Sequence, residues 1–539
     1  VFQINTDFKK VHLIALICSI SIWLLSGCLV RLTPGSPTNA NTGVPVEPTK
    51  VLETPSHFTT QAETNFIEEQ SQAVLPEFRT DLEALRDLPY YRIDLTVNFN
   101  ELTFEGIAHI DFLNNENISL ERIYFRLFPN GKKTYGDGSL IVTAVYVNGQ
   151  PVETKLSKSD TVLDVTLLNP LNPGHRTTFE IAFQGQVPRD FGGEETGAGY
   201  GIFNFSDGVL ALSGWYPILA VYDEDGWHLD PVSELGDSVY SEMAFYNVNL
   251  TVDSSLAVAA TGVEIGRRDE QGITRYHLVS GPVRDYFLAL SASYQVVSEE
   301  VAGTLVKSYY LPGHEDAGRT ALRIASDSLL VFNERFVVYP YSELELVEAP
   351  MRYALGVEYP SIFMVTSESY SEPDDTSFAA TIAHETAHQW WYNLVGNDVF
   401  DDPWLDEALT TYSTGLYYES KFGEGGYQGY SEYLQNRYDE LLEAGKDEVI
   451  TLDLPGFEAL GDPRIYSRVV YTKGALFFKS LREKIGDEAF FEALQNYFEN
   501  QKYRLAKPEN LLVEFETASG QKLEDFYQQW LYSKTTPKP

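Results

Sequence analysis

Hydrophobic and polar residues alternate along the chain from about residue 91 to residue 293. The first such run places Ile93, Leu95 and Val97 on one face with polar residues between them, which is typical of a half-buried strand. Similar short runs, separated by Asn, Gly and Pro turns, follow at residues 107–113, 123–128, 142–147, 162–168 and 178–183. Repeated short strands joined by turn residues predict an antiparallel β domain of roughly 200 residues.

The period of the pattern changes after residue 313. Apolar residues recur at helical spacing from Leu322 to Phe336, and Pro340 stops the helix. A short β-like section spans residues 342–365, and nearly all of the chain from residue 376 onwards has the pattern of amphipathic helices, including residues 487–499 and 508–518. We therefore place a domain boundary near residue 300. The antiparallel β domain is predicted over residues 81–300, and an α+β, mostly helical domain over residues 301–539.

The N-terminal segment has the layout of a secretory signal. Lys9 and Lys10 precede an uncharged run over residues 11–25, which closes on Leu25-Ser26-Gly27-Cys28. This tetrapeptide resembles a bacterial lipobox, in which the Cys thiol takes a diacylglycerol group. We expect residues 1–27 to be a lipoprotein signal peptide and Cys28 to be the lipidation site. An uncleaved signal anchor is the alternative, because the uncharged stretch continues through Val30 and reaches roughly the 20 residues of a membrane helix.

The residues that follow differ from both the signal and the folded domains. They are rich in Pro, Thr, Ser and Asn and show no apolar periodicity. Such a stretch buries too little surface to offset its ordering entropy, so residues 28–80 are predicted to be a flexible tether. With Lys9 and Lys10 remaining inside, either kind of anchor leaves the rest of the chain extracytoplasmic and attached to the membrane.

Charge and cysteine content exclude several classes of function. The chain has 39 Lys and Arg against 78 Asp and Glu, a formal net charge of -39. Such a surface repels nucleic acid and anionic lipid, so we expect no nucleic-acid partner and membrane contact only through the N-terminal anchor. The two cysteines, Cys18 and Cys28, lie in the export segment and cannot form a disulfide framework.

The chemistry of the chain is indicated by the sequence His384-Glu385-Thr386-Ala387-His388. On a helix, His384 and His388 share one face, where both imidazoles can bind the same Zn²⁺. Glu385 lies beside the first ligand and is placed to take a proton from the attacking water rather than to bind the metal. A solvated helix face is the alternative interpretation of this motif.

A catalytic zinc needs a third protein ligand and an open position for water. Glu407 follows His388 with 18 residues between them, at the start of a second predicted helix that begins at Trp404. This separation lets the first helix finish near Gly396 and the chain fold back. Two histidines and one glutamate form a ligand set that zinc peptidases use to activate water. We therefore predict one zinc ion per chain.

These motifs resemble the zinc aminopeptidases of the aminopeptidase N family, in the gluzincin group. Two further elements agree with the resemblance. The family has a Gly-x-Met-Glu-Asn element before the zinc helix, and this chain has Gly356-Val357-Glu358-Tyr359. The family also places a Tyr before Lys-Gly-Ala, as Tyr471 stands before Lys473-Gly474-Ala475. The resemblance implies a thermolysin-like catalytic domain, with Glu358 and Gly356 binding substrate and Tyr471 stabilising the oxyanion.

The implied reaction is the release of N-terminal residues from peptides that have a free N-terminus. Zinc and Glu385 hydrolyse the peptide bond, while Glu358 holds the substrate ammonium so that one residue is removed. A thermolysin-like endopeptidase or an epoxide hydrolase of the same superfamily is the alternative within the enzyme class. A non-enzymatic binding module that keeps the fold is the alternative outside it.

The chain departs from the family in two respects. Tyr392 stands where relatives commonly have Gly, and Leu355, Val357 and Tyr359 depart from the pattern of the substrate-binding element. The family usually adds a further helical domain, whereas this chain ends at Pro539, so a short two-domain form is expected.

Overall fold

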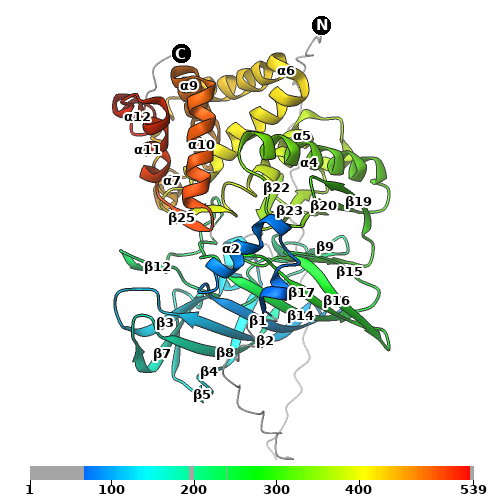
Figure 1. Cartoon of the computed structure of the whole chain (residues 1–539). Helices are drawn as coiled ribbons and strands as arrows, with labels where there is room; N and C mark the ends of the chain where they lie inside the picture. Colours follow the sequence, from blue (N-terminus) through cyan, green and yellow to red (C-terminus); the bar gives the residue numbers. More distant parts are fainter. Residues whose placement is uncertain (1–65, 193–198, 238, 535–539) are drawn as a thin grey trace, which may run out of the picture. The chain divides into compact units, whose positions relative to one another are not determined.

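The structure is a computed structural model that describes residues 66–192, 199–237 and 239–534, which belong to one compact unit (Figure 1). The predicted signal peptide, its alternative as an anchor, and the lipidation site Cys28 lie outside the described residues. Within the described residues, no helix has both the length and the apolar character needed to cross a membrane.

The N-terminal domain is organised around a twisted eight-stranded sheet. Its central strand β1 (Tyr90–Asn98) alternates between buried and exposed side chains, as its sequence pattern predicts. Among the described strands of this sheet, β1 and β14 form a parallel pair and the other pairs are antiparallel. In order across the sheet, the strands are β16 (Val263–Glu270), β17 (Ile273–Val279), β14 (Phe245–Asp253), β1, β2 (Thr103–Leu113), β8 (Arg176–Gln186), β4 (Ser139–Val147) and β5 (Gln150–Pro151).

Two four-stranded sheets and a two-stranded ribbon complete this domain. The first sheet consists of β15 (Ala257–Ala260), β18 (Leu288–Ser291), β10 (Val209–Leu212) and β9 (Phe203–Ser206). The second consists of β11 (Ile218–Leu219), β3 (Leu120–Arg126), β7 (Val162–Leu171) and β6 (Thr154–Ser157), and β12 (Tyr222–Asp223) pairs with β13 (Gly226–Trp227). Short helical turns connect the strands at η1 (Pro76–Phe78), α2 (Arg79–Ala84), η2 (Phe128–Asn130) and α3 (Lys132–Tyr135). The predicted β domain is thus confirmed.

The second domain begins with a mixed five-stranded sheet. Its strands, in order, are β19 (Gln295–Val301), β20 (Thr304–Tyr310), β21 (Glu343–Ala349), β23 (Ile362–Thr366) and β22 (Gly356–Tyr359). The predicted boundary near residue 300 falls within β19. β22 lies at the edge and pairs with β23 alone among the described strands. One margin of β22 is therefore free of sheet partners, next to the helices that carry the predicted zinc ligands.

Helices make up most of the remaining chain, as the sequence predicts. α4 and α5 pack against each other, and α5 also packs against β22, β23 and α6 (Figure 1). The helices are α4 (Glu315–Arg335), η3 (Ser369–Ser371), α5 (Thr376–Ala387), α6 (Trp404–Glu443), α7 (Leu454–Ala459), α8 (Pro463–Tyr466), η4 (Ser467–Lys473), α9 (Gly474–Ile485), α10 (Asp487–Gln501), α11 (Pro508–Ser519) and α12 (Glu524–Trp530). α6 is interrupted at Gly423, whose φ of 68° is outside the helical range.

The predicted end of the zinc helix near Gly396 is wrong. α5 ends at Ala387, and the next residues form a tight turn in which Val395 N–H donates to the Trp390 carbonyl (2.9 Å). Gly396 instead belongs to β24 (Val395–Asn397), which pairs in parallel with β25 (Arg504–Ala506). Trp390 and Trp391 are both fully buried; Phe336 packs on both indoles, and Tyr497 packs on Trp391. The helix ends in a turn because both indoles are buried in the core. This tertiary packing cannot be inferred from the helical pattern of the sequence.

The predicted tether extends too far toward the C-terminus. Residues 66–80 are packed on the folded part, and Ala73, Val74 and Leu75 are buried. Val74 forms a β-bridge with Tyr341, and Leu75 N–H donates to the Pro340 carbonyl (2.7 Å). Three apolar residues are too few to show a period, so their burial could not be inferred from the pattern. The rest of the predicted tether, residues 28–65, lies outside the described residues.

A buried lysine fixes the segment that carries Tyr471. Lys473 ends the π-helical segment η4, and its ammonium donates to both Asp447 carboxylate oxygens (3.1 and 3.2 Å). It also donates to the carbonyls of Glu448 (2.7 Å) and Ser533 (3.0 Å). A buried charge needs such partners, and these partners tie η4 to the loop after α6 and to the C-terminal segment.

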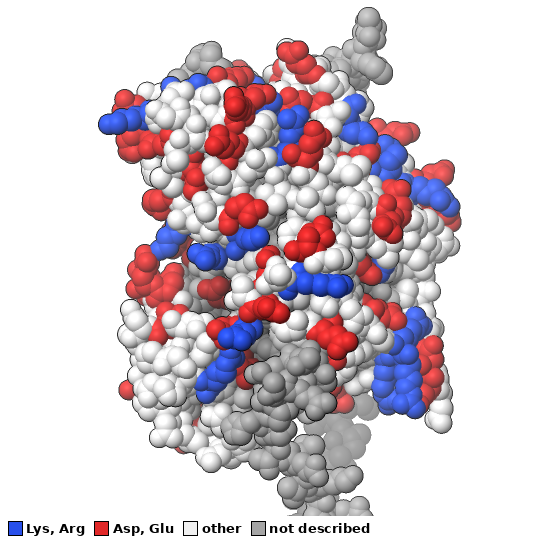
Figure 2. Space-filling view, in the orientation of Figure 1, with Lys and Arg blue, Asp and Glu red and all other residues white. Residues whose placement is uncertain are grey.

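Surface charge is dispersed on the face drawn in Figure 2. Asp and Glu side chains are spread across this face, with Lys and Arg side chains between them. The net charge of -39 thus acts here as a general negative field rather than as one local patch.

Candidate metal centre

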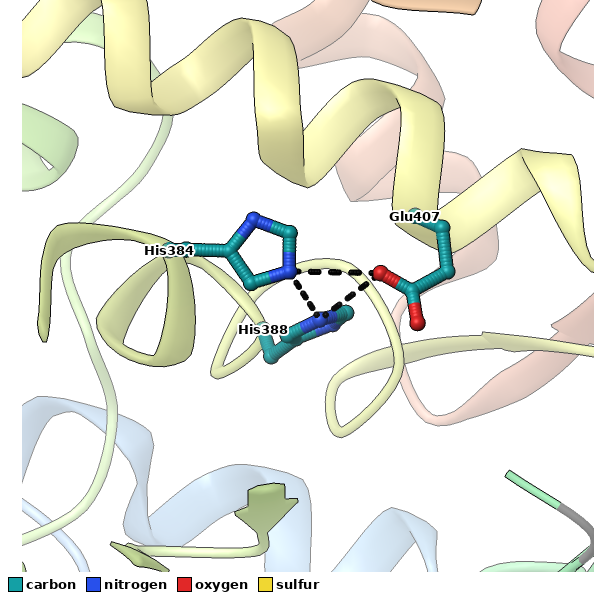
Figure 3. A group of neighbouring side chains, drawn as sticks. All are labelled: His384, His388 and Glu407. Carbon is teal, nitrogen blue, oxygen red and sulfur yellow. Dashed lines mark hydrogen bonds and ion pairs between the residues drawn. The ribbon is translucent and has the colours of Figure 1, made fainter. Parts of the chain in front are cut away.

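Two neighbouring helices supply the three predicted zinc ligands. His384 lies in the last turn of α5, and His388 is the residue that caps this helix. Both residues have right-handed helical backbone, so their side chains lie on one face. Glu407 lies in the first turn of α6 and points toward both imidazoles (Figure 3). Asp375 caps the N-terminus of α5, where its carboxylate accepts a hydrogen bond from Ser377 N–H (2.7 Å).

The spacing of the three ligand atoms fits a zinc ion. His384 Nε2 lies 3.1 Å from His388 Nε2 and 3.2 Å from Glu407 Oε2. His388 Nε2 lies 3.4 Å from the same carboxylate oxygen. A tetrahedral ion with bonds of about 2.0–2.1 Å needs ligand atoms about 3.3–3.4 Å apart. The three atoms therefore already form one face of such a tetrahedron (Figure 3).

The hydrogen bond of His388 Nδ1 determines that Nε2 is the nitrogen that faces the metal position. His388 Nδ1 lies 3.0 Å from the Trp391 carbonyl oxygen, which can only accept a hydrogen bond. Nδ1 therefore carries the proton, and the lone pair of Nε2 is free for a metal. Thr410 Oγ1 lies 3.3 Å from the same Nδ1, on the next turn of α6 after Glu407. The ring of His388 is fully buried, so these contacts fix its orientation.

Negative charge is concentrated around the two imidazoles. Glu358, Glu385 and Glu407 are all buried, and Glu385 Oε2 has no hydrogen-bond partner among the described residues. Burial and the charge of Glu358 raise the pKa of Glu385 well above its usual range. Burial also acts to raise the pKa of Glu407, but hydrogen bonds with His384 and His388 outweigh it and lower that pKa to about 2. Buried carboxylates in this number need a cation, which the donor set can hold.

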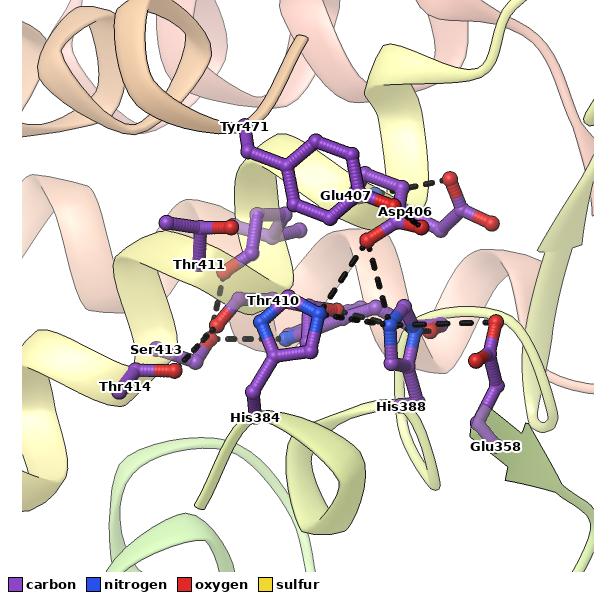
Figure 4. Close-up of polar contacts among 12 residues, drawn as sticks. Glu358, His384, His388, Asp406, Glu407, Thr410, Thr411, Ser413, Thr414 and Tyr471 are labelled. Atoms are coloured by element: carbon purple, nitrogen blue, oxygen red, sulfur yellow. Dashed lines mark hydrogen bonds and ion pairs between the residues drawn. The ribbon is translucent and has the colours of Figure 1, made fainter. Parts of the chain in front are cut away.

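The edge strand β22 brings the predicted substrate-binding residues to the same place. Glu358 Oε1 lies 3.9 Å from His388 Nε2 (Figure 4). Gly356 lies two residues earlier on the same strand face. A Cβ atom on Gly356 would lie 2.3 Å from Glu385 Oε1, so the glycine is required for the carboxylate to occupy its position. The edge strand and the predicted general base are thus in direct contact.

Tyr471 approaches the metal position from the side opposite β22. Its hydroxyl donates to Glu407 Oε1, and its ring stacks on that of His384 with centroids 5.8 Å apart (Figure 4). Burial raises the pKa of the Tyr471 phenol well above its usual value, so this group remains a hydrogen-bond donor. A π-helical segment presents Tyr471, and such segments are frequent at functional sites.

All seven residues predicted for the centre lie in this one region, although the sequence analysis did not identify every group that supports them. The predicted residues are His384, His388, Glu407, Glu385, Glu358, Gly356 and Tyr471. Thr410 was missed, and its position three residues after Glu407 on one helix could have identified it. The contacts of Tyr392 were also missed, since they involve residues more than a hundred positions away.

A known family model matches the part of the chain that contains this centre. Residues 320–530 match the peptidase family M1 domain. This part of the chain is thus similar to that domain. The matched range begins within α4, ends at the last residue of α12 and includes all seven residues of the centre.

The chain also has relatives among curated proteins. Aminopeptidase M1 of Arabidopsis thaliana is 29% identical over 244 residues, which cover 44% of this chain and 27% of that protein. Probable aminopeptidase 1 of Saccharolobus solfataricus is 23% identical over 449 residues, which cover 78% of this chain and 52% of that protein. The matches thus span about a quarter to a half of the length of these relatives.

Solved structures of an M1 zinc metallopeptidase from Deinococcus radiodurans are similar over more of the chain. One has a TM-score of 0.62 at 21% identity and covers 84% of this chain and 94% of that chain. A mutant of that protein bound to a Tyr-Ser-Ala substrate has a TM-score of 0.61 at 21% identity. This likeness establishes the fold, a β-rich N-terminal domain followed by an α+β, mostly helical, domain.

The geometry of the metal centre predicts one zinc ion per chain. His388→Ala removes one ligand and is expected to lower the bound zinc from about one ion to less than a tenth of an ion per chain, because catalytic sites have few protein ligands to spare. The zinc content of protein passed through a desalting column, measured by inductively coupled plasma mass spectrometry, checks this. His175→Ala is the control, since the His175 side chain is exposed and its ring lies near the Pro173 carbonyl (3.1 Å), far along the chain from the metal centre. An unchanged zinc content in His388→Ala would contradict the assignment.

Proposed function

We propose that this chain is a zinc-dependent aminopeptidase that releases N-terminal residues from peptides. The arrangement of His384, His388 and Glu407, with the unpaired carboxylate of Glu385 beside them, carries the proposal. The M1 domain match, the relatives named as aminopeptidases and the similar fold of a zinc metallopeptidase support it.

The general base is the central part of the proposed mechanism. Zinc, when bound by the three ligands, polarises the scissile carbonyl and makes water a stronger nucleophile at neutral pH. Glu385 takes the proton from the attacking water and later delivers it to the leaving amine. Gly356 leaves room for the Glu385 carboxylate, and burial keeps competing solvent away from it. Tyr471 donates a hydrogen bond to the oxyanion that develops on the carbonyl.

Substrate position is set by β22 in this proposal. Its free margin offers backbone groups to an extended peptide, in the manner of an added strand. Glu358 then binds the α-ammonium group and fixes the register, so that the bond after the first residue lies at the metal centre. The negative field of the chain also favours the approach of cationic N-termini.

Glu385→Gln is expected to abolish hydrolysis while zinc remains bound. The amide keeps the size of the side chain but cannot accept the proton from water, so kcat should fall by about 10³-fold or more. Turnover of an aminoacyl chromogenic substrate and zinc content, measured on the same preparation, check the two parts. Substantial activity in a zinc-loaded Glu385→Gln protein would rule out this residue as the base.

A free N-terminus is expected to be required for cleavage. An N-acetylated peptide lacks the ammonium that Glu358 binds, and Glu358→Gln should lower kcat/KM for the unblocked peptide roughly 10- to 100-fold, in line with a lost charge-assisted hydrogen bond. Products of paired blocked and unblocked peptides, identified by mass spectrometry, provide the measurement. Cleavage of both peptides at comparable rates would indicate an endopeptidase instead.

We also propose that the enzyme is an extracytoplasmic, membrane-anchored lipoprotein. The support is the sequence Leu25-Ser26-Gly27-Cys28 at the end of an apolar run that follows Lys9 and Lys10. Mass spectrometry of the N-terminal peptide is expected to find a diacylglycerol-modified Cys28. An unmodified peptide that contains Ser26 and Cys28 would refute the lipid anchor.

A further inference from the structure

The turn after the zinc helix contains a residue in an unusual backbone conformation. Tyr392 has a φ of 116°, a region that glycine adopts easily and that strains a residue with a Cβ atom. Strained backbone of this kind persists only where the surroundings hold it in place. The contacts of Tyr392 therefore show which groups hold its backbone in this conformation.

Two adjacent residues of the β domain hold Tyr392 at both ends. The Tyr392 hydroxyl donates to Asp285 Oδ2 (2.9 Å), and its carbonyl oxygen accepts from Arg284 Nε (2.6 Å). Arg284 and Asp285 lie in the segment between β17 and β18 and are 2% and 3% exposed. They connect the β domain to the turn between α5 and β24.

Arg284 is itself anchored, so it can act as a fixed point. Its guanidinium also donates to the carbonyls of Ser241 and Arg504, and it lies in space that a side chain at Gly396 would occupy. A Cβ atom at Gly396 would approach Arg284 Cζ to 2.1 Å. The β domain, β24 and β25 thus enclose one buried guanidinium.

The peptide unit that precedes Tyr392 contacts a zinc ligand. The Trp391 carbonyl accepts from His388 Nδ1 (3.0 Å), and the N–H of the same peptide, which belongs to Tyr392, donates to the Val395 carbonyl (2.9 Å). The φ angle of Tyr392 rotates this peptide relative to the rest of the residue. Holding Tyr392 at its carbonyl and its hydroxyl therefore sets the direction of the Trp391 carbonyl.

We propose that Arg284 and Asp285 are positioning residues for the zinc ligand His388 and that they act through Tyr392. The inference rests on the proposed zinc site and adds a connection from the β domain to it. Thr410 supports the same imidazole nitrogen from α6, at 3.3 Å, so the clamp on Tyr392 is one of two supports. Loss of the clamp should loosen His388 and speed zinc release without removing a ligand.

The rate of zinc release from the full-length chain tests this connection. Tyr392→Phe removes only the hydroxyl contact with Asp285, and Tyr392→Gly removes this contact together with the backbone strain, while the carbonyl contact with Arg284 remains in both variants. Both variants are expected to lose zinc to an excess of a chromophoric chelator about 10-fold faster than the unchanged chain, the lower range for a lost partner behind a metal ligand. Tyr246→Phe is the matched control, because it removes a buried hydroxyl that bonds Tyr216 within the β domain (2.8 Å). The control should release zinc at the original rate.

Thermal unfolding of the metal-free proteins separates positioning from general stability. A lower melting temperature with an unchanged zinc-release rate in either Tyr392 variant would overturn the inference, since it would assign Tyr392 a structural role only. Faster release in Tyr246→Phe as well would overturn it for the same reason. If one Tyr392 variant fails to fold, the other gives the result, because glycine suits the backbone and phenylalanine preserves the packing. A chain that binds no zinc at all would instead contradict the proposed function, and the inference with it.

Discussion

The metal centre depends on the direction of one lone pair, that of His388 Nε2. His388 caps the C-terminus of α5, so helical backbone precedes it but does not follow it. Its Nδ1 proton is committed to the Trp391 carbonyl, and this leaves Nε2 as the nitrogen that faces Glu407 and His384. The alternative tautomer would place a proton where the metal must bind. Early termination of α5 is therefore part of the site, because only a turn returns a main-chain carbonyl to the ring.

Electrostatics explains why a metal and this pocket belong together. Glu358, Glu385 and Glu407 are buried within reach of two imidazoles, an arrangement that is costly for a chain without a compensating cation. A dication removes much of this cost, so folding of the pocket and metal binding reinforce each other. The same charge balance leaves Glu385 without a hydrogen-bond partner, which keeps its oxygen available for a proton.

Local patterns in the sequence predicted most of the fold, and spacing predicted the ligands. The alternation in β1 and the helical period in α4 are set by neighbours in sequence, and His384 and His388 converge because four residues make about one helical turn. The predictions were wrong where contacts between residues distant in sequence determine the local structure. Residues 73–75 are held by the segment before β21, and the end of α5 is set by the burial of two indoles. Arg284 gave no signal, since nothing near it in sequence indicates a contact with Tyr392.

Gly356 has a consequence for how substrate preference can diversify on this scaffold. Any side chain there would collide with the Glu385 carboxylate and force it out of its present position. Selectivity has to change at the flanking residues, Leu355, which is 55% exposed, and Val357, which is partly buried. Both residues depart from the pattern of the family that the sequence resembles, as does Tyr359. A substitution at Gly356 would therefore disturb the general base itself, whereas substitutions at its two neighbours leave the Glu385 carboxylate in place.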